Sequence, residues 1–333
     1  MMSLTEMTEE LAIEASGLKK SYGTAHVLGG VDLRVTRGSV FSLLGPNGAG
    51  KTTMVRILST LTRPDAGQAR VAGYDIVGDR HLVRRCISLT GQYAAVDQLQ
   101  TGEENLRIMG RLSGMSSRQA RGRAGDLLDR FGLAEVARRR VSTYSGGLRR
   151  RLDLAAGLVG SPSVIFLDEP TTGLDLRSRQ TMWAVITDLA RSGVTVFLTT
   201  QYLEEADQLA DRVAVLDGGR VVAEGTPEEL KAQVAAQRLD LTLADRAAFD
   251  EVVRGLGGRV VTSDPGHLTV GAATDGTAAH IRAMLDEVDP GRGTVQRFAV
   301  HSATLDDVFL ALTGHAAGQA SPEGPTAKEI SHV

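Results

Sequence analysis

The stretch GPNGAGKTT, residues 45–53, decides the fold of this chain. It matches the pattern G-x-x-x-x-G-K-[ST], with Gly45, Gly50, Lys51 and Thr52 in the required positions. The apolar run VFSLL precedes it and an amphipathic segment follows it, and this context separates a functional loop from a chance match. The sequence therefore predicts a loop that wraps around phosphate groups.

Each residue type in this loop has a chemical reason to be there. Glycines let the backbone approach phosphate oxygens closely, and the amides at the start of the following helix attract an anion. Lys51 would neutralise the β- and γ-phosphates of a nucleotide, and Thr52 would hold Mg²⁺. A glycine-rich turn without function would leave Lys-Thr-Thr unexplained. The residues predicted to bind ATP here are Gly45, Pro46, Asn47, Gly48, Ala49, Gly50, Lys51, Thr52 and Thr53.

VIFLDEP, residues 164–170, places two carboxylates after four apolar residues. In α/β folds, ligands bind beyond the carboxyl ends of such buried strands. Asp168 would hold Mg²⁺ through its water shell, and Glu169 would align the attacking water and accept its proton. Alone, a strand that ends in Asp-Glu is more often a helix N-cap. Together with the phosphate loop it predicts the second half of a nucleotide-hydrolysing site.

Short apolar runs alternate with amphipathic stretches from about residue 11 to 228. VDLRV, VFSLLG, CISLTG, VIFLDEP and VTVFLTT have the character of buried parallel strands, and TTMVRILSTL and RSRQTMWAVITDLARS have that of helices. VAVLDGGRVVAEG at 213–225 is typical of a hairpin, and TPEEL at 226–230 of a helix start. We therefore predict an α/β nucleotide-binding domain over residues 12–230.

The pattern changes after about residue 236. The predicted order is strand, helix, strand, strand, helix, strand and one further helix, as in a small ferredoxin-like α+β unit over residues 237–314. It contains no glycine-rich loop and no cluster of His, Cys or carboxylates, so we expect a regulatory or partner-contacting domain. Residues 1–11 are largely acidic and polar and residues 315–333 are small and polar, so disorder is expected at both ends.

The composition of the chain argues against several other classes of protein. The net charge of -3 gives no global basic field, so no nucleic-acid partner is expected. Cys86 is the single cysteine; an internal disulfide is therefore excluded, and a small core residue is the favoured interpretation. The first residues lack the apolar stretch of a secretory signal, and no apolar run approaches the roughly 18 residues of a membrane helix. Any work at a membrane is expected to go through a partner.

YSGGLRRRLDLA, residues 144–155, lies between the phosphate loop and the Asp-Glu strand. Ser-Gly-Gly in this place resembles the signature motif of the ATP-binding-cassette (ABC) ATPases. The resemblance covers residues 13–230, because KSYG, TGQYAAVDQLQTGEEN and TTGLD also occur in that family's order. Leu148 and Tyr144 depart from the commonest signature, which has Gln and Leu there, but the residues that face phosphate are kept.

The resemblance implies roles that the residues alone do not. It makes Tyr22 the ring on which adenine stacks, and Gln92 a sensor that contacts Mg²⁺ and communicates with a membrane partner. Ser145, Gly146 and Gly147 would close on the ATP of a second subunit, and Asp175 would belong to the same nucleotide interface. One chain holds one phosphate loop and one signature, so a homodimer is expected, in which closure and hydrolysis drive a conformational change.

LTTQYLEEAD, residues 198–207, contains the residue that is hardest to assign. In the family, the position after this strand is usually a histidine that contacts the γ-phosphate, and here it is Gln201. Glutamine can donate to a phosphate oxygen and accept from water, but it cannot become cationic. We therefore expect Glu169 to act as general base and Gln201 as a neutral positioning residue.

A narrower resemblance follows from TTQYLEEADQLADR and the terminal TLDDVFLALTGH. Both are similar to the daunorubicin-resistance-type subgroup of drug and lipid exporters, over nearly the whole chain. This implies an ATPase subunit on the cytoplasmic face of the membrane, bound to separately encoded integral membrane permeases. An importer ATPase shares every catalytic motif and stays an alternative. So does a soluble ABC protein that acts on ribosomes or DNA, although these usually carry two cassettes in one chain.

Overall fold

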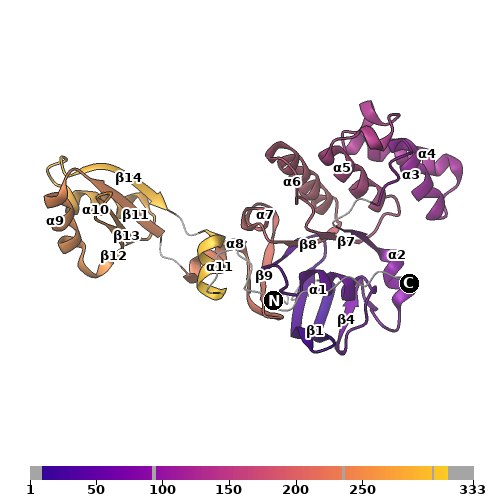
Figure 1. The fold of residues 1–333 in the computed structure, drawn as a ribbon, viewed down its shortest axis with the longest axis horizontal. Coiled ribbons are helices and arrows are strands. Elements are labelled where there is room, and N and C mark those ends of the chain that lie inside the picture. Colours follow the sequence, from indigo (N-terminus) through magenta and orange to yellow (C-terminus); the bar gives the residue numbers. More distant parts are fainter. Residues whose placement is uncertain (1–9, 92–94, 235–236, 302–303, 314–333) are drawn as a thin grey trace, which may run out of the picture. The chain divides into compact units, whose positions relative to one another are not determined.

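The computed structural model describes residues 10–91, 95–234, 237–301 and 304–313, which divide into two compact units with the boundary after Pro227 (Figure 1). Most of the segments predicted to be disordered lie outside these residues. Leu11 is an exception, because it begins the first strand and pairs with Thr36. The expectation of disorder up to residue 11 was therefore wrong at its last residue.

The first unit is built on a six-stranded sheet with the order β10-β9-β3-β8-β7-β6. All neighbours in it are parallel except the hairpin of β9 and β10, which confirms the α/β prediction. The strands are β3 (Val40–Leu44), β6 (Ile87–Thr90), β7 (Val164–Asp168), β8 (Thr195–Thr200), β9 (Arg212–Asp217) and β10 (Arg220–Gly225).

A second, antiparallel sheet in this unit was not predicted. It has the order β2-β1-β4-β5 and consists of β1 (Leu11–Tyr22), β2 (Ala25–Thr36), β4 (Ala66–Val71) and β5 (Tyr74–Asp75). VDLRV was expected to be a buried parallel strand, but Asp32 and Arg34 in it are exposed while Val31, Leu33 and Val35 are buried. Such alternation is typical of an antiparallel sheet with one solvated face.

Side chains from opposite faces of the parallel sheet enter two different cores. Phe166 and Phe197 point into the core shared with α1 (Lys51–Leu58) and the antiparallel sheet, where their ring centroids lie 5.6 Å apart. Ile165 and Leu167 point into the core shared with the helices of the other face. Because successive side chains of a strand point to opposite faces of the sheet, each strand packs against one layer on either side.

α2 (Arg80–Cys86) lies on the α1 side of the parallel sheet, because its Val83 enters the first core. On the other side, α5 (Gly146–Gly157), α6 (Leu176–Arg191) and α7 (Leu203–Leu209) form the second layer, and α3 (Gly102–Leu112) and α4 (Ser117–Arg130) form a helical arm (Figure 1). In the arm, α3 and α4 each begin with a capping box, in which Thr101 pairs with Glu104 and Ser116 with Gln119.

The second unit contains the ferredoxin-like order predicted from the sequence. Its sheet runs β12-β13-β11-β14 and is antiparallel throughout. Leu239, Leu241 and Leu243 of β11 face the core formed with α9 and α10. The elements are α8 (Pro227–Val234), β11 (Gln237–Leu243), α9 (Arg246–Leu256), β12 (Val260–Asp264), β13 (Thr269–Thr274), α10 (Ala278–Val288), β14 (Val295–His301) and α11 (Leu305–Thr313). None of the described helices is both long and apolar enough to cross a bilayer.

A fully buried carboxylate lies close to the carboxyl edge of the parallel sheet. Glu205 in α7 is 0% exposed, and its Oε1 accepts a hydrogen bond from Trp183 Nε1 of α6 at 3.2 Å. Burial raises the pKa of Glu205 above its ordinary value, while the neighbouring hydroxyls of Thr200 and Thr171, the Trp183 hydrogen bond and the charge of Arg179 oppose the increase. Burial lowers the pKa of Arg150, and the charges of Asp153, Asp168 and Glu205 act in the opposite direction.

We predict that Glu205→Gln gains stability relative to the parent as pH rises. Since the pKa of Glu205 is raised on folding, the native state binds the extra proton, and parental stability falls from about pH 4.5 upward to the folded pKa. Glutamine keeps the acceptor for Trp183 without the charge. Each pH unit of this window adds about 1.4 kcal/mol to the difference in unfolding free energy.

Urea unfolding of both proteins between pH 4.5 and 8 measures this difference. The control is Glu204→Gln on the same helix, whose carboxylate is exposed and ends 3.8 Å from Arg179. A difference for Glu205→Gln that does not change with pH would contradict a buried, destabilised carboxylate.

Candidate functional site

The phosphate loop joins β3 to α1, as the sequence predicted. Gly50 is the N-cap of α1 and has φ 108°, a conformation that L side chains rarely adopt. A Cβ there would also lie 2.8 Å from Leu28 Cδ2 and 3.0 Å from the Val27 carbonyl oxygen. Glycine at this position therefore allows both the turn and the close packing of β2, and leaves the α1 amides open to an anion.

Lys51 is buried within its own loop. Its Nζ donates to the carbonyl oxygens of Gly45 at 2.6 Å and Pro46 at 3.1 Å, and lies 3.8 Å from Glu169 Oε1. Burial lowers the pKa of Lys51, and the charges of Glu169 and Asp168 act in the opposite direction. A cation that is held by exchangeable carbonyls at the start of a helix is suited to a polyanionic ligand.

Asp168 lies at the end of β7, which is separated from β3 by β8, and it reaches the phosphate loop across that strand. Its Oδ1 accepts hydrogen bonds from Thr199 Oγ1 at 2.5 Å and from Thr52 Oγ1 at 3.3 Å. The carboxylate is 6% exposed, and these hydroxyl and carboxylate oxygens are the donor set that Mg²⁺ prefers. Thr52 and Asp168 therefore fit the metal that the sequence implies. Thr199 was missed, because its place opposite Asp168 depends on strand register.

Glu169 follows directly in a strained turn. Its φ is 49°, in the left-handed region that non-glycine residues rarely enter, and such strain is common where function demands it. Its amide donates to the Thr199 carbonyl at 3.0 Å, and its Oε2 accepts from Thr172 Oγ1 at 3.3 Å. The side chain is 10% exposed and faces the Lys51 ammonium. The geometry suits a carboxylate that receives a proton from a water molecule beside a phosphate.

Gln201, Tyr22 and Gln92 are the predicted residues whose roles the structure does not test. Gln201 is the first residue after β8. The last residue of β8, Thr200, pairs with Leu44, which directly precedes the phosphate loop. Tyr22 ends β1, is 48% exposed and carries the Lys20 ammonium 5.4 Å from its ring centroid, so its ring is accessible for stacking. Gln92 lies outside the described residues. The roles of all three stay predictions.

The Ser-Gly-Gly segment starts α5. Ser145 is the N-cap and its Oγ accepts from the Leu148 amide at 3.3 Å. A Cβ on Gly147 would lie 2.6 Å from Ser178 Oγ, so this position requires glycine for close packing. Asp175 holds Ser178 in place: its Oδ1 accepts a hydrogen bond from the Ser178 amide at 2.9 Å, and its Oδ2 accepts one from the Ser178 hydroxyl at 2.7 Å. Within the chain Asp175 is thus the N-cap of α6 and braces Gly147.

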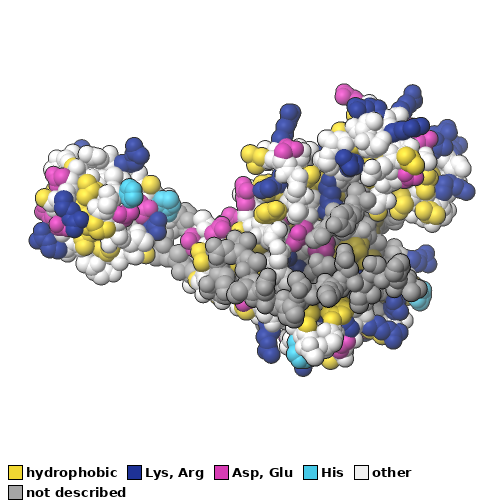
Figure 2. All heavy atoms as spheres, in the orientation of Figure 1, with side chains coloured by type: hydrophobic (Ala, Val, Ile, Leu, Met, Phe, Trp, Pro, Cys, Tyr) yellow, Lys and Arg dark blue, Asp and Glu magenta, His cyan; other side chains and the backbone are white. Residues whose placement is uncertain are grey.

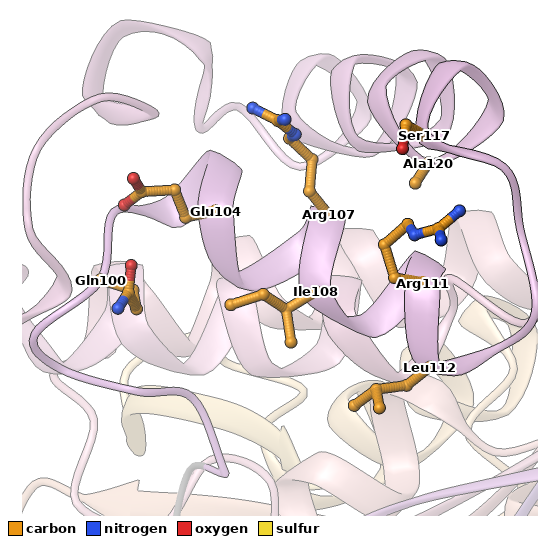
Figure 3. A pocket seen from close by; sticks show the side chains of 8 residues that line it. All are labelled: Gln100, Glu104, Arg107, Ile108, Arg111, Leu112, Ser117 and Ala120. Atoms are coloured by element: carbon orange, nitrogen blue, oxygen red, sulfur yellow. The ribbon is translucent and has the colours of Figure 1, made fainter.

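Two features of this region were missed by the sequence analysis. One is Arg150 in α5, which is 7% exposed. The other is a pocket of about 400 Å³ along α3, whose side chains Figure 3 shows. The pattern of arginines in YSGGLRRRLDLA gives no sign of which one is buried, and Ile108 and Leu112 look like core residues until the helix is seen to expose them.

The comparisons with known proteins agree with this geometry. Residues 28–172 match the family model described as ABC transporter, and residues 225–313 match the one described as ATP-binding protein DrrA1-3-like, C-terminal domain. The daunorubicin/doxorubicin resistance ATP-binding protein DrrA of Streptomyces peucetius is 50% identical over 96% of this chain and 97% of its own length. Nod factor export ATP-binding protein I of Ralstonia nicotianae is 37% identical over 91% and 94%.

Solved structures share the fold of the first unit. The dimeric post-hydrolysis state of the ATP-binding cassette MJ0796 bound to ADP and Pi has 26% identity and a TM-score of 0.58, and the match covers 64% of this chain and 98% of that one. The cbiO1 subunit of Clostridium perfringens has a TM-score of 0.64 at 24% identity, over 68% and 92%. Given relatives this similar over nearly its whole length, the chain belongs to the ABC transporter family, among the ATP-binding proteins with a DrrA-like C-terminal domain.

Proposed function

We propose that the chain is the ATP-hydrolysing subunit of an exporter, which works as a homodimer on the cytoplasmic face of the membrane beneath separate permease subunits. The observation that carries the proposal is the convergence of Lys51, Asp168 and Glu169 at the carboxyl ends of β3 and β7. The relatives named for drug resistance and for Nod factor export support the direction of transport.

Hydrolysis follows from this arrangement. The α1 amides and Lys51 hold the β- and γ-phosphates, with Lys51 exchanging its bonds to loop carbonyls for phosphate oxygens. Thr52 and Asp168 would hold Mg²⁺, which when bound neutralises charge on those phosphates. Glu169 accepts a proton from the water that attacks the γ-phosphorus, as the bond to the β-phosphate oxygen breaks and ADP leaves. Gln201 would orient that water as a neutral donor and acceptor.

The second half of each site is proposed to come from a second copy of the chain. Ser145 and the exposed Gly146 begin α5, whose first amides are separate from the phosphate loop and would supply a second anion site. The match to the dimeric MJ0796 cassette supports a head-to-tail pair. Closure of that pair around two ATP molecules would supply the movement, and hydrolysis would reopen it.

The permease is proposed to dock on the α3 face of the helical arm. Ile108, Met109 and Leu112 are 46%, 38% and 76% exposed there, and Ile108 and Leu112 line the pocket of Figure 3. Figure 2 shows basic side chains gathered over α3 and α4, and Arg107 and Arg111 lie on the same pocket. An amphipathic cytoplasmic segment of the permease with acidic residues at its rim fits this surface.

The cargo is proposed to be an amphipathic drug, antibiotic or lipid. The test is ATP turnover by the chain alone and with the membrane protein encoded beside it, reconstituted in lipid vesicles with a panel of such compounds. Turnover that rises with the membrane protein and with one compound class supports an exporter. Stimulation only by a solute-binding protein would favour an importer, and stimulation by ribosomes or DNA alone would favour the soluble alternative.

Glu169→Gln is predicted to bind ATP but to lower kcat by roughly 10²–10⁴-fold, because the proton acceptor is lost while the phosphate-binding groups stay. The variant should accumulate as an ATP-bound dimer in size-exclusion chromatography. Its control is Glu204→Gln, an exposed carboxylate on α7, which should hydrolyse ATP normally. A Glu169→Gln protein with the parental kcat would refute the base assignment.

Ile108→Glu is predicted to abolish stimulation of turnover by the membrane protein and to leave basal turnover unchanged. The reason is that a carboxylate in place of this apolar side chain must be desolvated when the permease binds. Val77→Glu, on an exposed loop between β5 and α2, is the matched control because Val77 is 41% exposed. Turnover assays with and without reconstituted permease measure both variants, and full stimulation of Ile108→Glu would exclude this docking surface.

A further inference from the structure

A buried arginine in α5 contacts several parts of the site but has no role in the hydrolysis described above. The guanidinium of Arg150 points at backbone carbonyls: Nε donates to Pro170 at 2.9 Å, and Nη1 donates to Gly91. Nη2 lies 3.4 Å from the carbonyl oxygens of both Asp168 and Glu169. One side chain therefore holds three consecutive peptide groups of the turn that carries the proposed base.

Asp153, one turn further along α5, supports this arginine. It is 5% exposed, and its Oδ2 lies 3.8 Å from Arg150 Nη1. Its Oδ1 accepts a hydrogen bond from the Ala95 amide at 2.8 Å. Gly91 and Ala95 are the described residues on either side of positions 92–94. The Arg150–Asp153 pair thus joins α5 to both flanks of that segment and to the turn after β7.

The turn needs such support because of its backbone. Glu169 has φ 49°, and a residue in the left-handed region persists only where its surroundings hold it. The Thr199 carbonyl holds the Glu169 amide from one side, and the Arg150 fork holds the carbonyls from the other. A planar guanidinium with several fixed donors can bind diverging carbonyls, whereas an ammonium acts as a point charge.

We propose that Arg150 is a positioning residue for ATP hydrolysis, which holds the 168–170 turn so that the Glu169 carboxylate faces the attacking water, and that Asp153 keeps the guanidinium in place. This inference rests on the proposed role of Glu169 as general base. Arg150 itself touches neither nucleotide nor water in this role, since its donors end on backbone carbonyls. Its effect is therefore on the geometry of the base.

The test is Arg150→Gln in the full chain, because Gln keeps one donating nitrogen but removes the three-nitrogen fork. Displacement of the base should lower kcat by about ten- to a hundredfold, while Kd and KM for ATP stay within about threefold because the phosphate loop is intact. Arg150→Lys should not restore kcat, since it keeps charge without the fork. In a Glu169→Gln background, Arg150→Gln should cause no further loss.

Arg151→Gln is the matched control. Arg151 is the next residue of α5, and its Nη1 donates to the carbonyl oxygens of Phe131 at 2.9 Å and Gly132 at 3.5 Å, away from the site. This variant loses the same kind of bond and should keep the parental kcat. Asp153→Asn is a milder second variant, which weakens the ion pair but keeps an acceptor for the Ala95 amide, and it should lower kcat in the same direction by a smaller factor.

The outcomes separate the inference from the proposed function. A parental kcat in Arg150→Gln or full rescue by Arg150→Lys would overturn the positioning role. So would an equal loss in Arg151→Gln, or a further loss in the Glu169→Gln background. If Arg150→Gln does not fold, Asp153→Asn decides, and its parental kcat would overturn the role. If Glu169→Gln itself hydrolyses ATP at the parental rate, the base assignment fails, whatever the Arg150 variants do.

Discussion

The register of three neighbouring parallel strands determines the rest of the site. Leu44 of β3 pairs with Thr200 of β8, and Asp168 of β7 pairs with Thr199 of the same strand. Parallel strands end at the same edge of a sheet, so the residues that follow them, the phosphate loop, the carboxylates and Gln201, emerge together. A slip of one residue would turn each side chain to the opposite face and separate these groups.

Two cores keep that register in place. The side chains of β3, β7 and β8 enter a core with α1 and the antiparallel sheet on one face, and a core with α5 and α6 on the other. Lys51, Asp168 and Glu169 therefore lie at or just beyond the ends of strands that are packed on both faces, which limits their conformational freedom. Asp175 and Ser178 extend this order outward, because they support Gly147 at the start of α5.

The sequence predicted the parts of this protein that rest on local chemistry. Lys51 and Thr52 begin the helix that follows one strand, Asp168 ends another strand and Glu169 comes directly after it, so pattern and context were enough to place them in the fold. The antiparallel sheet was missed, although the alternation around Asp32 and Arg34 signalled it, because the surrounding α/β rhythm was given more weight. Thr199, Arg150 and the exposed face of Ile108 depend on register and packing, which no local pattern records.

The hydrogen bonds that Lys51 makes to its own loop affect how strongly and how selectively the loop binds a nucleotide. The ammonium already has two carbonyl partners, in Gly45 and Pro46. A nucleotide that binds must therefore replace these two carbonyl oxygens as hydrogen-bond acceptors of the ammonium. The affinity of the loop is then the difference between the contacts of Lys51 with phosphate and its contacts with the loop carbonyls. The stronger the carbonyl contacts are, the more the loop selects a triphosphate over an anion that binds more weakly.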